Sequence, residues 1–292
     1  GSTDTLAAIA RAAARTAAAD TPTPARVHLH IDTGMARDGA PAATVPALIT
    51  LAQRAHAAGL IRVEGLMGHL AHARDLHANT RGIGQFARAI IAMREAGLDP
   101  GIRHLAATAS ALTDPRARWD AVRVGAGLYG IDPSGTTQLR SALTLAAPVI
   151  ATRRVPAGTP VSYGATWHAA AETTLATIPL GYADGIPRAA TGAEVWLAGR
   201  RRPIVGTVCM DQIVLNCADD PIEPGTTAVI LGPGTHGEPT TAEWAAWSGT
   251  IEHEIVTGIG SRVTRFYDDD AHSRSRPVPS GAAGTAVNGE AA

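Results

Sequence analysis

The order of the local sequence patterns most constrains what this chain can fold into. Strand-like and helix-like segments alternate through the first 128 residues. The predicted strands span residues 27–32, 63–70, 101–108 and 121–128, and the predicted helices span residues 4–19, 44–58 and 81–96. Apolar side chains recur at helical spacing in the helical segments, and glycines follow two of them. Strands that alternate with helices predict a parallel sheet, open or closed.

The pattern changes near Pro133. From residue 143 to 232 the chain shows short β runs separated by Gly and Pro, which is typical of an all-β domain. Thr240 and Glu243 have the spacing of a capping box and predict one late helix. After Tyr267 the sequence has no periodicity and is expected to be disordered. We therefore expect a first domain at residues 1–132, a β-domain at residues 133–267 and a tail at residues 268–292.

The charged residues exclude several classes of function. All twenty-five basic residues are Arg, and the net charge is −1. Without lysine, these residues alone cannot form a Schiff base, and without a positive excess a polyanion-binding protein is disfavoured. No apolar run approaches the ~18 residues of a membrane span, and the two cysteines fit no CxxC pattern. We expect a cytoplasmic protein with no nucleic-acid or membrane partner, and we assign no metal site.

Two short motifs suggest functions that their context does not support. Residues 125–130, GAGLYG, fit the dinucleotide-binding pattern, but the acidic residue expected about twenty positions later is missing. A Gly-containing strand end can still hold a phosphate through its backbone N–H groups. Residues 32–34, DTG, match the aspartic-protease triplet, which needs a second carboxylate to share a proton. We favour neither a dinucleotide site nor a protease.

Polar residues stand near the ends of four successive predicted strands. Arg37 follows the first, His69 ends the second, Thr108 ends the third and Arg123 lies in the fourth. Barrel enzymes place their active-site groups at these strand ends. A single strand His is more often a core residue and a single Arg more often a surface ion pair, but the set of four favours a functional site.

The β region contains two further candidates. Tyr163 stands beside Gly164 at a predicted turn, where the alternative is an ordinary rim residue. Asp211 lies inside an apolar strand pattern, where an unpaired charge is costly, and the alternative is a turn or bulge. Residues 181–185, GYADG, have the pattern of an ordinary loop between strands.

Together these segments resemble the alanine racemases, which use pyridoxal 5'-phosphate (PLP) to interconvert L- and D-alanine. The matching stretches are HLHIDTGMARDG, EGLMGHLAHA, RHLAATASAL, VRVGAGLYG, VSYGAT, PLGYADG and PIVGTVCMDQ, followed by a weaker match in RVTRFY. The resemblance implies a (β/α)8 barrel followed by a β-domain. A complete barrel takes about 250 residues, so we expect residues 1–132 to form only its C-terminal half.

The resemblance also implies chemical roles. Tyr163 corresponds to a base that exchanges the α-proton on one face of the substrate, with His69 and Arg123 in its supporting network. A free tyrosine has a pKa of about 10, so a tyrosine base near neutrality needs about 4 kcal/mol of help. Arg123 also matches the Arg that faces the pyridine nitrogen. The phosphate-binding groups align with Thr108, Gly125 and Ala126.

Four further positions align with the substrate side of the site. Arg37 and Met210 match groups around the substrate carboxylate, Tyr182 matches a residue at the entrance, and Asp211 matches an acid in the catalytic set whose direct role is undefined. His30 stands where many relatives carry a modified Lys that orients the Arg matched by Arg37.

The implied assembly is a homodimer in which the β-domain of one subunit completes the partner's site. The implied product, D-alanine, supplies peptidoglycan synthesis. The PLP-binding Lys belongs to the barrel half that we expect to be missing, so we expect the chain to be inactive alone. Two alternatives stay open: a non-catalytic dimerisation or binding remnant of the same fold, and a racemase for another small amino acid such as serine.

Overall fold

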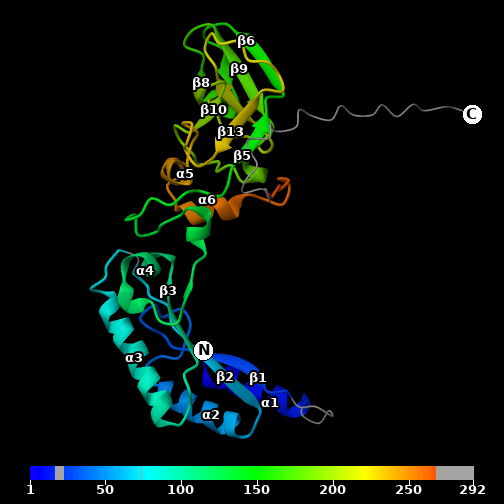
Figure 1. The fold of residues 1–292 in the computed structure, drawn as a ribbon. Coiled ribbons are helices and arrows are strands. Elements are labelled where there is room, and N and C mark those ends of the chain that lie inside the picture. Colours follow the sequence, from blue (N-terminus) through cyan, green and yellow to red (C-terminus); the bar gives the residue numbers. More distant parts are fainter. Residues whose placement is uncertain (17–22, 73, 268–292) are drawn as a thin grey trace, which may run out of the picture. The chain divides into compact units, whose positions relative to one another are not determined.

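The computed structural model describes residues 1–16, 23–72 and 74–267 (Figure 1). The chain divides into two compact units, the first comprising Gly1–Arg140 and the second beginning at Ser141. The predicted tail, residues 268–292, and the end of the first predicted helix lie outside the described residues. Among the described helices, none is both long enough and apolar enough to cross a membrane.

Unit 1 is built on a four-stranded parallel sheet in the order β1-β2-β3-β4. Its strands are β1 (Ala25–His30), β2 (Ile61–Met67), β3 (Ile102–Ala107) and β4 (Ala121–Arg123). Its helices are α1 (Thr3–Thr16), α2 (Val45–Ala57), α3 (Asn79–Glu95) and α4 (Thr108–Thr113), with 3-10 turns η1 (Pro115–Ala117) and η2 (Ala126–Tyr129). The predicted alternation of parallel strands and helices is confirmed (Figure 1).

The two faces of this sheet differ in chemistry. One face packs against the helices in a single apolar core that includes Leu29, Leu48, Leu66 and Phe86. Side chains alternate between the faces of a strand, so the residues between the core positions point the other way. That second face carries the ion pairs in which Glu64 accepts from Arg26 and Arg62. The polar face and the strand ends beside it are therefore the place to look for a site.

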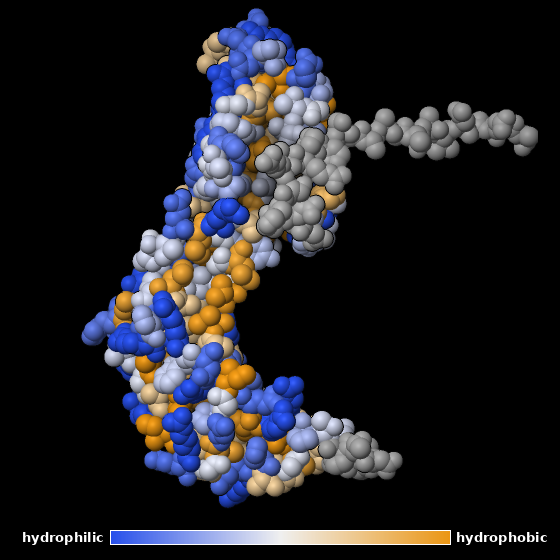
Figure 2. Space-filling view, viewed as in Figure 1, coloured by the Kyte–Doolittle hydropathy of each residue, from blue (hydrophilic) through white to orange (hydrophobic). Residues whose placement is uncertain are grey.

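The predicted fourth strand, residues 121–128, is longer than the strand in the structure. β4 ends at Arg123 instead of continuing to residue 128. The glycine-rich segment that follows turns into η2, where the Leu128 N–H donates to the Gly125 carbonyl at 3.0 Å. Apolar side chains reach the surface around β4 and η2, and exposed apolar patches are visible in Figure 2.

Unit 2 is mainly β structure, as predicted. Its strands are β5 (Leu145–Pro148), β6 (Ala151–Val155), β7 (Pro160–Val161), β8 (Trp167–His168), β9 (Thr173–Ile178), β10 (Glu194–Leu197), β11 (Arg200–Pro203), β12 (Ile213–Asn216) and β13 (Thr227–Leu231). They form sheets in the orders β11-β10-β13-β5, β12-β9-β6 and β7-β8. Short helical turns η3 (Tyr163–Ala165) and η4 (Tyr182–Asp184) interrupt the strands, and α5 (Thr241–Ser248) and α6 (Glu252–Gly258) follow them.

The late helix begins as its sequence predicts. The Thr240 hydroxyl accepts from the Glu243 N–H at 3.3 Å, and the Glu243 carboxylate accepts from the Thr240 N–H at 2.8 Å. This reciprocal pair satisfies backbone donors that the first turn of a helix leaves free. α5 then buries Trp244 in the core of unit 2, where its indole N–H donates to the Ile230 carbonyl at 2.7 Å.

Candidate active site

The four polar residues predicted at strand ends lie at the same edge of the unit 1 sheet. Arg37 lies in the loop after β1, and His69 lies two residues beyond β2. Thr108 directly follows β3, and Arg123 is the last residue of β4. Parallel strands present their carboxyl ends on one side of a sheet, so the chain order alone gathers these groups.

Arg123 contacts several groups at this edge. Its Nη2 lies 2.8 Å from the Gly68 carbonyl oxygen and 3.0 Å from Nδ1 of His69. Its Nη1 lies 3.0 Å from Nδ1 of His104 and 3.1 Å from the carbonyl oxygen of the same residue. In the described part of the chain, Nε of Arg123 has no hydrogen-bond partner. The half-buried guanidinium is therefore held by both Nη atoms and keeps one donor for a ligand.

The two histidines beside Arg123 are held in their neutral forms. Burial lowers the pKa of His69, and the nearby charges of Arg123 and Arg37 lower it further. Burial also lowers the pKa of His104 to about 4, again with a contribution from Arg123. A neutral imidazole has one donor and one acceptor nitrogen. Each ring can therefore accept a hydrogen bond from Arg123 through Nδ1.

The turn after β4 meets Thr108. The Gly127 N–H donates to the Thr108 hydroxyl at 3.2 Å. Among the described residues, no acceptor pairs with the N–H groups of Gly125 and Ala126, and the space beside Gly125 is open. A hydroxyl next to unpaired backbone N–H groups is a suitable set of donors for an anion such as phosphate.

The loop after β1 is organised by Asp32. One carboxylate oxygen of Asp32 accepts from the N–H groups of Gly34, Met35 and Ala36 at 2.9, 3.0 and 3.2 Å. These bonds, that from Gly34 above all, lower the pKa of the Asp32 carboxyl. The DTG triplet thus anchors its own loop. His30 lies 3.4 Å from the Asp38 carboxylate at the other end of the same loop.

In unit 2, the loop that carries Tyr163 is strained and tethered. Ser162 and Ala165 have positive φ angles of 64° and 47°, which non-glycine residues seldom adopt. The Ser162 hydroxyl donates to the Thr207 carbonyl at 2.6 Å, and the Thr207 hydroxyl donates to the Tyr163 carbonyl at 3.1 Å. The Tyr163 side chain itself is 74% exposed. Strain held by surrounding bonds is a common feature of functional sites.

A second loop pair brings Tyr182 beside Met210. The Tyr182 N–H donates to the Cys209 carbonyl and the Ala183 N–H to the Met210 carbonyl, both at 3.0 Å. A Cβ atom on Gly181 would overlap these two carbonyls, so a glycine is required at this approach. Within the described chain the N–H of Met210 has no acceptor, as its implied carboxylate-binding role requires.

This packing corrects the prediction for Asp211. Residues 208–212 form a loop rather than a strand, and β12 starts only at Ile213. The carbonyls of Cys209 and Met210 bond to the loop 181–185 instead of to a neighbouring strand. The Asp211 side chain is 54% exposed and pairs with Arg262 at 2.7 Å. Residues 181–185 are likewise more than a simple connection, since they form η4 against this loop.

Comparisons with known proteins agree with this geometry. Residues 1–133 match the family model for the alanine racemase N-terminal domain, and residues 142–267 match that for the alanine racemase C-terminal domain. An alanine racemase of Salinispora arenicola is 48% identical over 253 residues, covering 85% of this chain and 68% of that protein. The chain belongs to the alanine racemase family. An alanine racemase of Thermobifida fusca is also 48% identical, over 249 residues, covering 83% of this chain and 67% of that protein.

Solved alanine racemase structures share the fold. The enzyme of Streptomyces coelicolor A3(2) superposes with a TM-score of 0.87 at 40% identity, covering 92% of this chain and 72% of that one. The enzyme of Bartonella henselae, which carries covalently bound pyridoxal phosphate, superposes with a TM-score of 0.78 at 26% identity and with the same coverage. The chain therefore has the family's fold, a TIM-barrel-like N-terminal domain and a β C-terminal domain.

The residues of this racemase family member fit PLP in unit 1. The free Nε–H of Arg123 suits an acceptor such as a pyridine nitrogen. The Thr108 hydroxyl and the unpaired N–H groups of Gly125 and Ala126 suit a phosphate. Both sets belong to the same carboxyl edge of the sheet.

Sequence reasoning missed the residues that support this machinery. His104 holds Arg123, Ser162 and Thr207 hold the Tyr163 loop, and Arg262 bridges Asp211 and Asp184. A signal exists only for His104, a polar residue followed by three apolar residues to the end of β3. The predicted pairing of Tyr163 with His69 and Arg123 joins residues of different units and stays a prediction.

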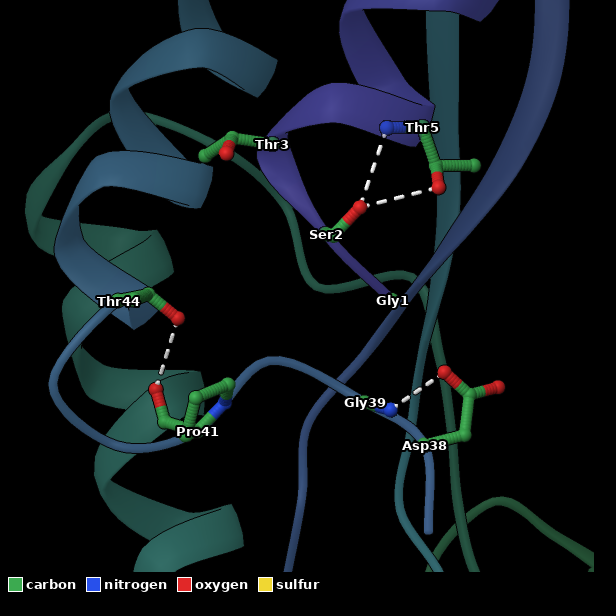
Figure 3. A pocket seen from close by; sticks show the side chains of 8 residues that line it. All are labelled: Gly1, Ser2, Thr3, Thr5, Asp38, Gly39, Pro41 and Thr44. Carbon is green, nitrogen blue, oxygen red and sulfur yellow. Dashed lines mark hydrogen bonds between the residues drawn. The ribbon is translucent and has the colours of Figure 1, made fainter. Parts of the chain in front are cut away.

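Figure 3 shows a hollow of unit 1 between the start of α1 and the segment that precedes α2. It has a volume of about 300 Å³ and is lined by Gly1, Ser2, Thr3, Thr5, Asp38, Gly39, Pro41 and Thr44. Its polar groups are used in local turns: the Thr5 N–H donates to the Ser2 hydroxyl at 3.1 Å, and the Thr44 hydroxyl donates to the Pro41 carbonyl at 3.1 Å. A smaller hollow, which shares Asp38 with the first, is lined by His30, Arg37 and His69 of the candidate site.

Proposed function

We propose that this chain carries cofactor-binding and catalytic residues of an alanine racemase, a PLP-dependent isomerase of L- and D-alanine that supplies peptidoglycan synthesis in the cytoplasm. The observation that carries the proposal is the hydrogen bonding of the Arg123 guanidinium. Both Nη atoms are fixed by carbonyls and neutral histidines, while Nε–H is left to donate. A permanently charged donor aimed in this way suits the ring nitrogen of the cofactor better than a structural ion pair, for which a carboxylate partner would be needed.

We also propose that residues 1–132 are half of a (β/α)8 barrel. A complete barrel of this type has eight parallel strands, and the described part of unit 1 has four. The residues of this half that would hold PLP are Arg123 at the ring nitrogen and Thr108, Gly125 and Ala126 at the phosphate. When bound, PLP supplies an electron sink that stabilises negative charge at the substrate α-carbon.

The remaining residues act on the substrate or hold the residues that do. Tyr163 takes or returns the α-proton through its phenolic oxygen, and the tethered loop fixes the backbone from which it acts. Arg37 and the Met210 N–H bind the substrate carboxylate, and Tyr182 lines the entrance. Asp211 acts indirectly, since its pairing with Arg262 holds the loop that presents Met210. His69 holds Arg123 and stays neutral, so it adds no second positive charge beside the guanidinium.

The active assembly in this proposal is a homodimer in which Tyr163 of one subunit serves the cofactor of the other. Sedimentation equilibrium of the purified chain tests the dimer. A monomer at micromolar concentration would contradict it.

The absence of lysine sets a condition on this function. The 292 residues contain no ε-amine, so a lysine that holds PLP covalently must come from residues outside this sequence. The chain alone is expected not to racemise alanine. The same observation favours a second candidate, a non-catalytic dimerisation or binding module that has kept the racemase fold.

A hybrid enzyme separates the two candidates. The segment of the Salinispora arenicola racemase that aligns with this chain is replaced by the corresponding residues of this chain, and the rest of that enzyme is kept. The racemase proposal predicts that the hybrid interconverts L- and D-alanine when supplied with PLP. A folded hybrid that binds PLP but changes neither enantiomer would support the non-catalytic module. Turnover of L-serine in preference to L-alanine would show that serine, and not alanine, is the preferred substrate.

A further inference from the structure

An imidazole outside the implied racemase machinery reaches the Arg123 cluster. His28 lies on β1 and His104 lies on β3, with β2 between them. Nδ1 of His28 is nevertheless 2.7 Å from Nε2 of His104, and the ring centroids are 5.0 Å apart. His104 is 9% exposed and contacts Arg123 through its other nitrogen. The contacts thus form a continuous chain from His28 through His104 and Arg123 to His69.

The sheet makes room for this contact. The β1–β2 register shifts between Val27 and His28, and the shift sets His28 opposite Gly65 of β2. A Cβ atom at Gly65 would overlap Nδ1 and Cε1 of the His28 ring. The ring therefore occupies the space of the absent side chain and crosses β2 to reach β3. A glycine inside a strand is otherwise unfavourable, and close approach of another group is a usual reason for it.

The donors and acceptors in this series of side-chain contacts can be assigned in one way only. A guanidinium donates and never accepts, so Nδ1 of His104 must accept from Nη1 of Arg123. Neutral His104 then carries its proton on Nε2, and that N–H donates to Nδ1 of His28. His28 in turn carries its own proton on Nε2. The opposite tautomer of His104 would place an N–H against an N–H of Arg123.

We propose that His28 is a positioning residue for Arg123. By accepting from Nε2–H of His104, it fixes the tautomer and ring orientation in which Nδ1 of His104 holds Nη1 of Arg123. Its meaning for catalysis rests on the proposed function, in which Arg123 faces the cofactor. The assignment of protons does not, because it concerns contacts within unit 1 alone.

The tautomers can be read directly. Long-range 15N–1H correlation spectra of the full chain, labelled in histidine and arginine and without cofactor, should show His104 with a protonated Nε2 and an unprotonated Nδ1. His28 should show the same pattern. A His104 proton on Nδ1 would overturn the proposal without any variant.

Variants test the direction of the effect. In His28→Leu the Nε2–H of His104 loses its acceptor, and a buried donor without a partner is unfavourable. We expect its exchange with water to accelerate at least tenfold, its ring 15N shifts to move toward the average of the two tautomers, and the Arg123 Nη1 signals to broaden. His28→Asn keeps an acceptor oxygen near the position of Nδ1 and should restore most of the wild-type spectrum.

His77→Asn is the matched control, because His77 is exposed and its ring has no hydrogen bond within the described chain. It should leave the His104 signals unchanged. Wild-type His104 and Arg123 signals in a folded His28→Leu chain would refute the role of His28. That outcome is distinct from failure of the racemase proposal, which is measured as turnover by the hybrid enzyme.

Discussion

Nη2 of Arg123 lies 3.0 Å from Nδ1 of His69. Because a guanidinium can only donate, this contact assigns the acceptor lone pair of His69 to Nδ1 and its single proton to Nε2. Burial and the neighbouring positive charges lower the pKa of His69 and favour the same neutral form. The pair therefore has one permanent charge, on Arg123, and one neutral ring that orients it.

Removal of the Arg123 charge should change the titration of His69. In Arg123→Gln, the pKa of His69 should rise toward its ordinary value of about 6.5, but only in part because burial, the larger cause, remains. The measurement is an NMR titration of the His69 ring. Arg116→Gln is the control, because Arg116 pairs with Asp114 and not with His69. An unchanged His69 titration in Arg123→Gln would show that the charge does not act on this ring.

The depressed pKa of His104 predicts acid sensitivity of unit 1. The folded chain has a pKa of about 4 at His104, while the unfolded chain should have the ordinary value of about 6.5. Between these values the unfolded state binds more protons, so the free energy of unfolding falls as the pH drops from about 6.5 toward 4. The expected loss between about pH 7 and pH 5 is on the order of 2 kcal/mol.

Hydrogen-exchange protection factors of the β3 amides measure this loss. His104→Asn should weaken the dependence without abolishing it, because His69 also has a lowered pKa. If the variant and the wild type lose β3 protection equally on acidification, His104 is not the source of the acid sensitivity.

Arg262 should order the loops that carry Tyr182 and Met210. It pairs with Asp211 at 2.7 Å and with the buried Asp184 at 3.4 Å, and Asp184 also accepts from the Gly181 N–H at 2.9 Å. In Arg262→Ala we expect faster hydrogen exchange at residues 181–185 and 208–212, with only a small loss in global stability because the pairs are partly exposed.

Arg154→Ala is the control for this variant, since Arg154 pairs with exposed Glu172 and Asp219 elsewhere in unit 2. It should leave exchange in the two loops unchanged. Equal loop exchange in Arg262→Ala and wild type would mean that the backbone contacts suffice without the arginine.

Two glycines near Tyr163 offer a matched test of the tethered loop. Gly164 and Gly206 have similar positive φ angles of 73° and 72°, so alanine costs about 1–2 kcal/mol in backbone conformation at either site. At Gly206 the added Cβ would also lie 2.6 Å from Ser162 Cβ, whereas at Gly164 the nearest atom is 3.7 Å away. Gly206→Ala should therefore lower the free energy of unfolding by at least about 1 kcal/mol more than Gly164→Ala. Equal losses in urea denaturation would contradict the close packing of this loop.

The sequence predicted those features that depend on local pattern. Periodicity identified the strands and helices of unit 1, and chain order placed Arg37, His69, Thr108 and Arg123 at one edge, because parallel strands end on one side. The start of α5 was predictable because its capping contact joins Thr240 and Glu243, which are only three positions apart.

Features that depend on register or on loop packing were not predictable. The contact of His28 with His104 requires a one-residue shift opposite Gly65, which no periodicity reveals. The mainly apolar residues 208–212 have the pattern of a strand, but the close approach of Gly181 brings the carbonyls of Cys209 and Met210 to another loop. The pairing of Arg262 with Asp211 spans 51 positions and leaves no local trace.

The most direct test of the proposed function is the exchange of the alanine α-proton in heavy water by the hybrid enzyme, measured separately from L- and D-alanine, with and without Tyr163→Phe. If Tyr163 is the base on one face, the substitution should slow exchange from one enantiomer by about 100-fold or more and leave exchange from the other much less affected. Exchange from both enantiomers within twofold of the unsubstituted hybrid would contradict the assignment of Tyr163 and, with it, the proposed catalytic role of this chain.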